Sequence, residues 1–352
     1  MKAIVVDTPG GRDVLTLRTI ADPVAQGKDV IIKVHSCGVC FHDVVTRNGT
    51  LKAGVKMPVI LGHEIAGTVV GTGPLARGFK QGDRVATAQR YHICGACAHC
   101  RSGYEPLCEE RKFLGDWGLV GGYAEFVAVE DDNVALVPDN VPLDQASIVA
   151  CTLGTVYNAM RDVAGVKVGE TVLITGSGGG LGVHAIQLAR LQGARVIAQT
   201  TSPQKADMLR DLGAHEGVVH RRGEDFSPQV RALTGGRGVD VAIDNVGSLL
   251  FNPTRKSIAV RGRWILIGQL NGDFVPFNPA QLFLKNISML SATSTTRNQL
   301  VQCLDLVASG AVRPVIGAVM PLEQAQEAHR LVEAGAVTGR IVLQPGLQEH
   351  AS

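Results

Sequence analysis

The chain of 352 residues is longer than a single hydrophobic core usually supports, so its length predicts two domains. Apolar residues make up 45% and charged residues 19% of the chain, which is typical of a globular protein and argues against disorder. The 34 Lys and Arg residues nearly balance the 32 Asp and Glu residues, which argues against nucleic acid or a membrane surface as the main partner and favours a small molecule.

The N-terminal segment contains one Lys and a short β-branched run that reaches Asp7 and Pro9. This run is too short to be the apolar part of a signal peptide, and no apolar run approaches the length needed to cross a bilayer. We therefore expect a cytoplasmic protein. Because thiols stay reduced in the cytoplasm, clustered cysteines favour metal binding or catalysis over disulfides.

Short β-branched runs separated by Gly and Pro fill the first part of the chain, for example AIVV, DVIIKV, GTVVGTG and YAEFVAV. They predict an irregular antiparallel β assembly. From about Lys167 onward, apolar runs alternate with helix-length amphipathic stretches, beginning with TVLIT before GVHAIQLARLQG. Repeated strand, helix and strand predict a doubly wound parallel sheet of the α/β class, which we place at residues 152–293.

The tail of the chain contains two helical stretches, 296–309 and 322–334, and a strand-like GRIVLQP. It is too short to form a third domain, so we expect it to pack on the first. The sequence therefore predicts one domain from residues 1–151 and 294–352, and a second from residues 152–293.

Four cysteines lie close together in a Gly-containing loop. Zinc prefers four tetrahedral thiolates in a structural site, and two-residue spacers let neighbouring thiolates turn towards one metal. An iron–sulfur cluster is the first alternative, but the pattern lacks the C-x3-C-P ending of bacterial ferredoxins. Free surface thiols are the second alternative. A closed four-thiolate site leaves no position for substrate, so this metal should serve stability alone. The residues, spaced C-x2-C-x2-C-x7-C, are Cys94, Cys97, Cys100 and Cys108.

A second group of metal-ligand types is dispersed along the chain. Cys40 lies in SCGVCFHDV, His63 and Glu64 lie in LGHEIAG, and Cys151 lies in VACTLGT. A catalytic zinc site needs three protein ligands and one open position. Taken singly, each residue is a weak indication, because a lone buried Cys is usually a small hydrophobe and a lone His is more often a structural hydrogen-bonding group.

The motifs together resemble a known family. GHE followed by AGTVVGTG, CGVC with Asp43 three residues later, the four-cysteine loop, and a strand before a Gly-rich turn occur in this order in zinc-dependent medium-chain dehydrogenases and reductases, the alcohol dehydrogenase-like family. The resemblance extends over essentially the whole chain. It implies a GroES-like irregular β catalytic domain and a Rossmann cofactor domain, with two Zn²⁺ per subunit. It also implies that Cys40, His63 and Cys151 bind the catalytic zinc, with Glu64 an alternate ligand or neighbouring carboxylate. Asp43 would orient a ligating imidazole.

The segment TVLITGSGGGLGVHAIQLAR predicts a dinucleotide site. A backbone that approaches a pyrophosphate, with a helix N-terminus aimed at it, needs residues without a Cβ at the contact points. One frame nearly fits the pattern G-x-G-x-x-G, with Ser177, Gly179 and Gly182 at its three positions, so Ser replaces the first Gly. Its placement after a strand and before a helix distinguishes it from an ordinary turn. The expected cofactor contacts are Ser177, Gly178, Gly179, Gly180, Leu181, Gly182 and Gly268.

The end of the second strand bears on the choice between NAD and NADP. NAD sites usually place a carboxylate there, but this chain has Thr200 and Thr201. Hydroxyls of Thr201 and Ser202 could donate to a 2′-phosphate and Lys205 could pair with it, so we favour NADP. The alternative is that these residues only cap and begin a helix.

The family resemblance predicts hydride transfer between the nicotinamide and an alcohol, aldehyde or ketone. Relatives commonly have a hydroxyl two residues after the first ligand and a His further on, as a proton relay. Here His42 and Val45 occupy these positions. His42 could bind substrate oxygen or move the proton, or it could make only a structural hydrogen bond.

This departure leaves two other functions open. Related reductases deliver hydride to an activated alkene, such as an enone or acryloyl-CoA, and a remote alternative is a cofactor-binding protein without turnover. Four aromatic residues near the motifs could line a substrate cleft or belong to the core: Phe41, Tyr91, Trp117 and Tyr123. The apolar run NISMLSA could pair with its symmetry mate, which predicts a homodimer or homotetramer.

Overall fold

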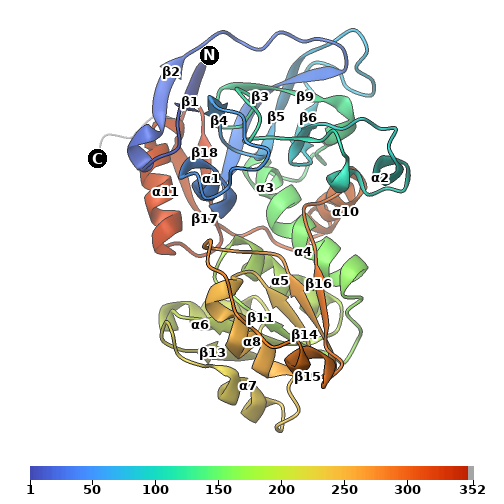
Figure 1. The fold of residues 1–352 in the computed structure, drawn as a ribbon. Coiled ribbons are helices and arrows are strands. Elements are labelled where there is room, and N and C mark those ends of the chain that lie inside the picture. The colour runs from blue at the N-terminus through green and yellow to red at the C-terminus, as the bar shows by residue number, and fades with distance from the viewer. Residues whose placement is uncertain (348–352) are drawn as a thin grey trace. The chain divides into compact units, whose positions relative to one another are not determined.

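The computed structural model describes residues 1–347, and the chain forms two compact units. Unit 1 contains residues 1–154, 294–310 and the segment after 313, and unit 2 contains residues 155–293 with 311–313. The ribbon in Figure 1 shows unit 1 as the blue to green and red elements, and unit 2 as the yellow-green to orange ones. Among residues 1–347, no helix is both long and apolar enough to span a bilayer.

Unit 1 is built on a seven-stranded sheet in the order β10-β6-β5-β3-β18-β17, with β9 also paired to β3. Its longest strand, β3, is rich in β-branched residues that suit a pleated, half-buried surface. The late strand β18 pairs antiparallel with β3, so the end of the described chain joins the same core as its beginning. The strands are β3 (Asp29–Val39), β5 (Glu64–Thr72), β6 (Arg84–Thr87), β9 (Phe126–Glu130), β10 (Val134–Leu136), β17 (Ile316–Pro321) and β18 (Arg340–Gln344).

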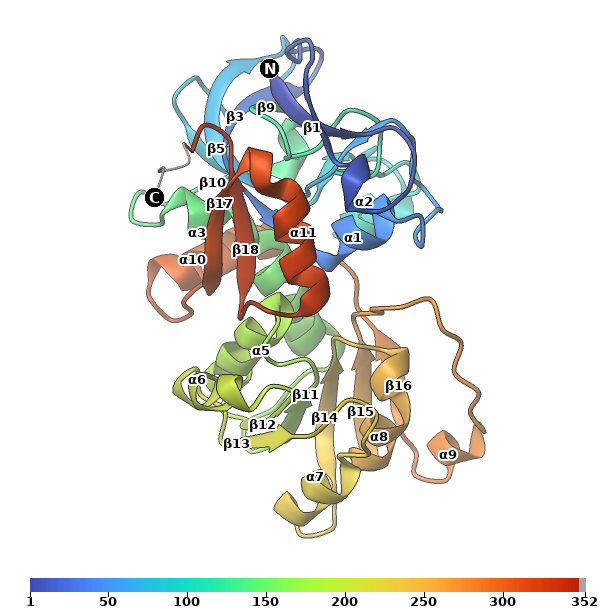
Figure 2. The same cartoon turned by 90° about the vertical axis from the view of Figure 1, so that its left-hand side faces the viewer.

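Two smaller sheets and several helices complete unit 1. The helix α11 packs against α1 and β18, and Figure 2 shows it beside β18. The predicted tail helices correspond to α10 and α11, each a little shorter than expected. The small sheets contain β1 (Lys2–Val6), β2 (Thr16–Thr19) and β4 (Val59–Ile60), and β7 (Arg90–His92) with β8 (Lys112–Phe113); the helices are α1 (Phe41–Arg47), α2 (Ala98–Arg101), α3 (Leu143–Ile148), α10 (Arg297–Ala308) and α11 (Ala325–Ala334).

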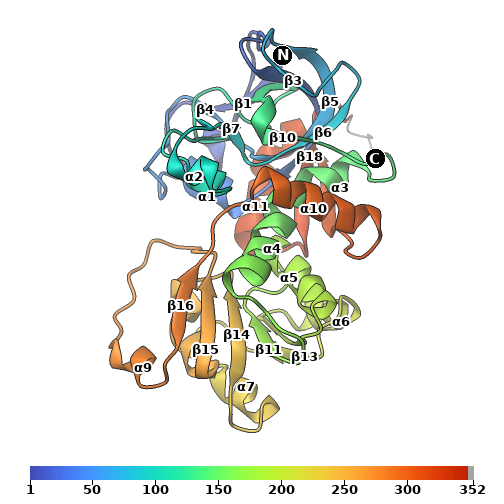
Figure 3. The same ribbon diagram turned by 90° about the vertical axis from the view of Figure 1, so that its right-hand side faces the viewer.

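Unit 2 is a six-stranded parallel sheet in the order β13-β12-β11-β14-β15-β16. This order is that of a doubly wound dinucleotide-binding fold, so the predicted fold class is confirmed. Figure 3 shows β16 beside β15, at the edge of this sheet. The elements are β11 (Thr171–Ile174), β12 (Arg195–Thr200), β13 (Glu216–Val219), β14 (Val239–Asp244), β15 (Ile258–Leu266) and β16 (Ser288–Ser291), with α4 (Thr155–Tyr157), α5 (Gly180–Leu191), α6 (Ala206–Asp211), α7 (Ser227–Leu233), α8 (Phe251–Ser257) and α9 (Ala280–Phe283).

Candidate metal centres and cofactor turn

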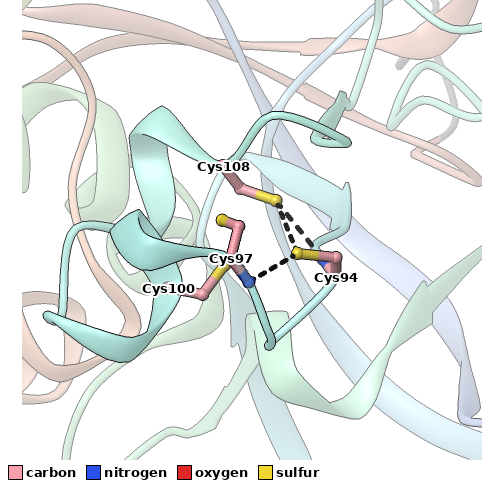
Figure 4. A group of neighbouring side chains, drawn as sticks. All are labelled: Cys94, Cys97, Cys100 and Cys108. Atoms are coloured by element: carbon pink, nitrogen blue, oxygen red, sulfur yellow. Dashed lines mark hydrogen bonds between the residues drawn. The ribbon is translucent and has the colours of Figure 1, made fainter.

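The four cysteines of the loop converge. Their sulfur atoms all lie within 4.8 Å of one another, and the Sγ atoms of Cys94 and Cys108 are 3.5 Å apart (Figure 4). The backbone N–H of Cys97 donates to Cys94 Sγ at 3.3 Å, and that of Cys94 donates to Cys108 Sγ at 3.3 Å. Amide donors from Cys100 and Glu109 lower the pKa of the Cys97 thiol to about 6. Burial and the hydrogen bonds of Cys108 and Cys97 raise the pKa of Cys100 to about 12, so it is the convergence of the four sulfurs that fits a tetrahedral Zn²⁺.

The four dispersed residues also meet in one place. The ligand atoms of Cys40, His63, Glu64 and Cys151 lie within 4.8 Å of one another, and the two sulfurs are 4.0 Å apart. Cys40 stands between β3 and α1, His63 and Glu64 stand at the start of β5, and Cys151 lies in a wide π-type helical turn after α3. Folding therefore brings residues 111 positions apart to one site.

The donor set fits a divalent zinc ion. Two thiols and an imidazole are the ligands that catalytic zinc accepts, and a buried carboxylate adjoins them. Glu64 Oε1 lies 2.7 Å from Nη2 of Arg340, but Oε2 has no hydrogen-bond partner among the described residues. A polar atom buried without a partner is costly, so a metal cation held here would satisfy it.

Asp43, which the family resemblance implies as the group that orients a ligating imidazole, lies beside the His63 ring. Its Oδ1 is 3.5 Å from His63 Nδ1, which leaves Nε2 of His63 for the cluster. The backbone N–H groups of Cys40 and Gly62 donate to the Asp43 carboxylate at 2.8 and 3.1 Å. Asp43 is fully buried, so these donors hold its charge in place of water.

Arg340 is part of the site and was missed from the sequence. Its Nη2 lies 2.7 Å from Glu64 Oε1 and 3.6 Å from Cys151 Sγ. Burial raises the pKa of Glu64 to about 7, against the opposing effect of Arg340. Burial also acts to lower the pKa of Arg340, but the charges of Glu64, Cys40 and Cys151 raise it above its ordinary value. In the sequence, the only indication of this role was that Arg340 lies in the closing GRIVL, which resembles the family. No sequence pattern near Arg340 indicates that it contacts Glu64.

Asp116 is a second residue that the sequence did not reveal. Its two carboxylate oxygens lie 3.0 and 2.9 Å from Nε2 of His42, and Thr46 Oγ1 donates to it at 3.0 Å. The His42 ring is 5.1 Å from the His63 ring and 5.0 Å from Phe113. Burial works to lower the pKa of His42, but the hydrogen bond and charge of Asp116 raise it overall. Asp116 engages Nε2, so Nδ1 is the ring nitrogen available for a further partner.

The aromatic residues expected near the motifs have different surroundings. Tyr123 is fully buried and its hydroxyl donates to Asp43, so it belongs to the core and not to a cleft wall. Trp117 and Tyr91 are half-buried, and the Lys112 ammonium lies over both rings.

The Gly-rich turn joins β11 to α5 in unit 2. A Cβ at Gly182, in the first turn of α5, would lie 2.5 Å from the carbonyl oxygen of Gly176, so only Gly fits there. A Cβ at Gly178 would lie 2.7 Å from Lys205 Cδ, which places the Lys205 side chain over the turn. Gly268 follows β15, and a Cβ there would meet the carbonyl oxygen of Asn245 at 2.2 Å.

The strand β12 contacts the Gly-rich turn through Gln199, a residue that the sequence analysis did not identify. Its Oε1 accepts from the N–H of Gly176 at 2.8 Å. Thr200 Oγ1 accepts from the N–H of Ser202 at 3.2 Å, so the chain turns sharply after β12. Thr201 and Ser202 thus stand at the carboxyl end of the strand next to the Gly-rich turn.

Comparison with known proteins identifies the two parts of the chain. Residues 26–139 match the alcohol dehydrogenase GroES-like domain, and residues 180–309 match the zinc-binding dehydrogenase family. The matched domains are those of an oxidoreductase. The chain belongs to the zinc-type medium-chain dehydrogenase/reductase family, which confirms the family predicted from the motifs and the GroES-like and Rossmann fold class.

Individual relatives include more than one activity. An acryloyl-coenzyme A reductase of Sulfurisphaera tokodaii is 32% identical, over 98% of this chain and 100% of its own. An alcohol dehydrogenase of Geobacillus stearothermophilus is 32% identical, over 97% and 99%. Among solved structures, AibC shares 43% identity with a TM-score of 0.90, covering 99% of this chain and 96% of its own. A NAD-dependent alcohol dehydrogenase shares 35% identity with a TM-score of 0.91, covering 98% and 100%.

Proposed function

We propose that the protein is a zinc-dependent, nicotinamide-linked oxidoreductase that interconverts an alcohol and its aldehyde or ketone. The observation that carries this proposal is the convergence of Cys40, His63, Glu64 and Cys151 in a chain of the zinc-binding dehydrogenase family. When bound, zinc would act as a Lewis acid on a substrate oxygen, and the nicotinamide would carry the hydride.

The protein side chains have separate tasks in this proposal. Cys40, His63 and Cys151 would hold the metal, and Glu64 would be an exchangeable ligand or a neighbouring charge. Arg340 offsets the negative charge of the thiolates and the carboxylate. The four-cysteine loop would hold a second zinc ion with a structural role, giving two per subunit.

His42 is the candidate for moving the proton. Asp116 accepts the hydrogen of Nε2, which leaves the lone pair of Nδ1 available when the ring is neutral. A neutral Nδ1 could take a proton from the reacting hydroxyl, and the Asp116 carboxylate would stabilise the resulting cation. This pair would replace the hydroxyl-to-His relay that the sequence lacks.

Hydride transfer to an activated alkene is the second candidate. It is favoured by the acryloyl-coenzyme A reductases among the relatives, which are as similar to this chain as the alcohol dehydrogenases are. It is also favoured by Val45 in place of the second relay residue. In this reaction the metal would polarise the carbonyl group of an enone or acyl thioester, and hydride would add to the β-carbon.

NADP is the proposed cofactor. Its 2′-phosphate would meet Thr201, Ser202 and Lys205 instead of the carboxylate typical of NAD sites. Two further cations support this assignment, because Arg221 and Arg222 directly follow His220, whose N–H donates to Thr200 at 3.3 Å. The other contacts would come from residues 177–182 and Gly268. Several relatives are named NAD-dependent, so the experiment must measure both cofactors.

The proposal also includes a domain division, an oligomeric state and a location in the cell. Residues 1–151 with 294–352 would be the catalytic domain and 152–293 the cofactor domain, which the borders of the compact units support. Among the described strands, β16 pairs with β15 alone and carries an exposed Met289, so its free edge would pair with a second copy in a homodimer or homotetramer. A cytoplasmic location is supported by six cysteines grouped as metal ligands.

One experiment tests the core of the proposal. Elemental analysis should find two zinc ions per subunit in the wild type and one in Cys151→Ala, and the variant should lose turnover. Oxidation of NADPH and NADH is then followed with aldehydes, with enones, with acryloyl-CoA and with no acceptor. A wild type with a single zinc ion, together with normal turnover in Cys151→Ala, would overturn the proposal.

A further inference from the structure

A buried chain of hydrogen bonds connects helix α11 with Asp43. Arg47 Nη1 lies 3.2 Å from His329 Nδ1, and His329 Nε2 lies 3.2 Å from Tyr123 Oη. The Tyr123 hydroxyl lies 3.3 Å from Asp43 Oδ2. All four side chains are buried. They come from α1, α11 and the segment before β9, and Figure 2 shows α1 and α11 side by side.

Arg47 fixes the direction of this chain. A guanidinium group has donors and no acceptor, so Nδ1 of His329 must accept and carries no hydrogen. Nε2 of the neutral ring then carries the hydrogen and donates to the Tyr123 oxygen. The tyrosine has one hydrogen, which is therefore directed to Asp43. Burial, together with the Arg47 charge, lowers the pKa of His329 to about 4, so the ring is neutral at pH 7.

The far end of the chain is itself held in place. Arg47 pairs through Nη2 with Glu333, which lies one turn after His329 on α11. Its side chain is 4% exposed, so it has little freedom to rotate. Since a guanidinium cannot accept a proton, this row of hydrogen bonds cannot carry protons out of the site. Its task is to fix the positions of the side chains that it connects.

At the end next to the metal-ligand residues, the hydrogen-bond chain supplies the third donor to Asp43. Cys40 and Gly62 supply the other two from their backbones, and both are fixed by the strands next to them. The Tyr123 hydroxyl is the side-chain donor among the three, and it acts on Oδ2 while Oδ1 faces His63 Nδ1 at 3.5 Å. Loss of this donor would leave Oδ2 held by the Cys40 N–H alone, so the orientation of the carboxylate would be less tightly fixed.

We propose that Tyr123 and His329 are positioning residues for the metal centre: they hold Asp43 in the orientation in which its carboxylate directs the His63 ring towards the two thiols. The inference rests on the proposed role of His63 as a ligand. A carboxylate that accepts the second ring N–H of a ligating His fixes the tautomer and raises ligand basicity, so its own orientation controls metal affinity.

Tyr123→Phe is the direct test, because it removes one oxygen and leaves the ring that packs against Gly62. Zinc affinity is measured by competition with a chelator, without substrate or cofactor, and the Co²⁺-substituted protein is examined by visible absorption. We expect about tenfold weaker binding of the metal held by Cys40, His63 and Cys151, and an altered visible spectrum of the cobalt-substituted protein. Tyr104→Phe, on the exposed surface of the four-cysteine loop, is the matched control and should change neither.

Two substitutions of His329 separate positioning from packing. His329→Leu should reproduce the loss seen in Tyr123→Phe, and the double variant should bind zinc little worse than either single one, because both break the same chain. His329→Gln keeps a side-chain donor and should recover part of the affinity. Urea unfolding of each zinc-loaded variant verifies that the fold is intact.

The outcomes distinguish this inference from the proposed function. If the wild type binds two metals, and Tyr123→Phe and His329→Leu bind both with wild-type affinity and an unchanged cobalt spectrum, the positioning role is wrong while the proposed function stands. If the wild type binds only the metal of the four-cysteine loop, the proposed function fails and this inference fails with it.

Discussion

Arg340 and Glu64 form a buried ion pair, with 2.7 Å between Nη2 and Oε1. Arg340 begins β18 and Glu64 begins β5, and both strands pair with β3. The pair therefore lies at one end of the sheet of unit 1, where the metal-ligand types meet. Each charge depends on the other, since neither is exposed to water.

Arg340→Met should destabilise the protein strongly. It leaves the Glu64 carboxylate buried without its cation, and breaking a buried pair in this way typically costs about 3–5 kcal/mol. Urea unfolding of the zinc-loaded protein measures this. Arg330→Met removes an arginine from an exposed pair with Glu327 on α11 and should leave the unfolding midpoint unchanged. Equal stabilities of the two variants would contradict the prediction.

Replacement of His42 should affect turnover more than folding. His42→Ala should lower kcat/KM for alcohol oxidation by about 100-fold or more, the range usual for loss of a general base. Asp116→Asn removes the group that raises the pKa of His42. The neutral base would then persist to lower pH, so the acidic limb of the kcat/KM profile should move to lower pH. Asp132→Asn, an exposed control, should leave the profile in place. An unmoved acidic limb in Asp116→Asn would show that His42 is not the base.

His329 should make stability depend on pH in a defined window. Its folded pKa is about 4, against an ordinary value of 6.5, so the folded state binds this proton less readily than the unfolded state. The contribution is complete above about pH 6.5 and is lost as the pH falls towards 4, amounting to about 3 kcal/mol. His329→Gln removes the titration, so its unfolding free energy should decline less steeply between pH 6.5 and pH 4. Parallel declines would contradict this assignment.

Lys205 should discriminate between the two nicotinamide cofactors. Its side chain lies over the Gly-rich turn, and the proposed 2′-phosphate would be its partner. Lys205→Ala should raise KM for NADPH about tenfold, the effect of losing a charge-assisted contact, and should hardly change KM for NADH. Lys80→Ala, an exposed lysine of unit 1, is the control. Similar changes for both cofactors would remove Lys205 from the phosphate site.

The sequence predicted those parts of the molecule that depend on local pattern. The parallel sheet of unit 2 follows from alternating strands and helices, and the Gly-rich turn precedes α5 as expected. The four cysteines lie within 15 residues, so their convergence needs only a loop. Cys40, His63 and Cys151 are far apart in sequence, and it was the family resemblance that grouped them.

The remaining residues of the site depend on pairings that no local pattern encodes. Arg340 reaches Glu64 because β18 lies beside β3, and Asp116 reaches His42 across 74 residues. From the sequence, Tyr123 was interpreted only as part of a cleft wall or of the core. Its hydrogen bond to Asp43 depends on the tertiary structure, which brings the segment before β9 next to α1. Buried polar contacts of this kind are set by tertiary structure.

The pairing of β18 with β3 also imposes an order on how the protein matures. During synthesis the four-cysteine loop emerges whole, so it could bind the proposed structural zinc while the rest of the chain is still being made. Cys40, His63 and Cys151 emerge early as well, but Arg340 and His329 arrive with the last elements of the described chain. Under the proposed function, a polypeptide that ends before Arg340 would lack both β18 and the buried cation beside Glu64, so it should retain only the zinc of the four-cysteine loop.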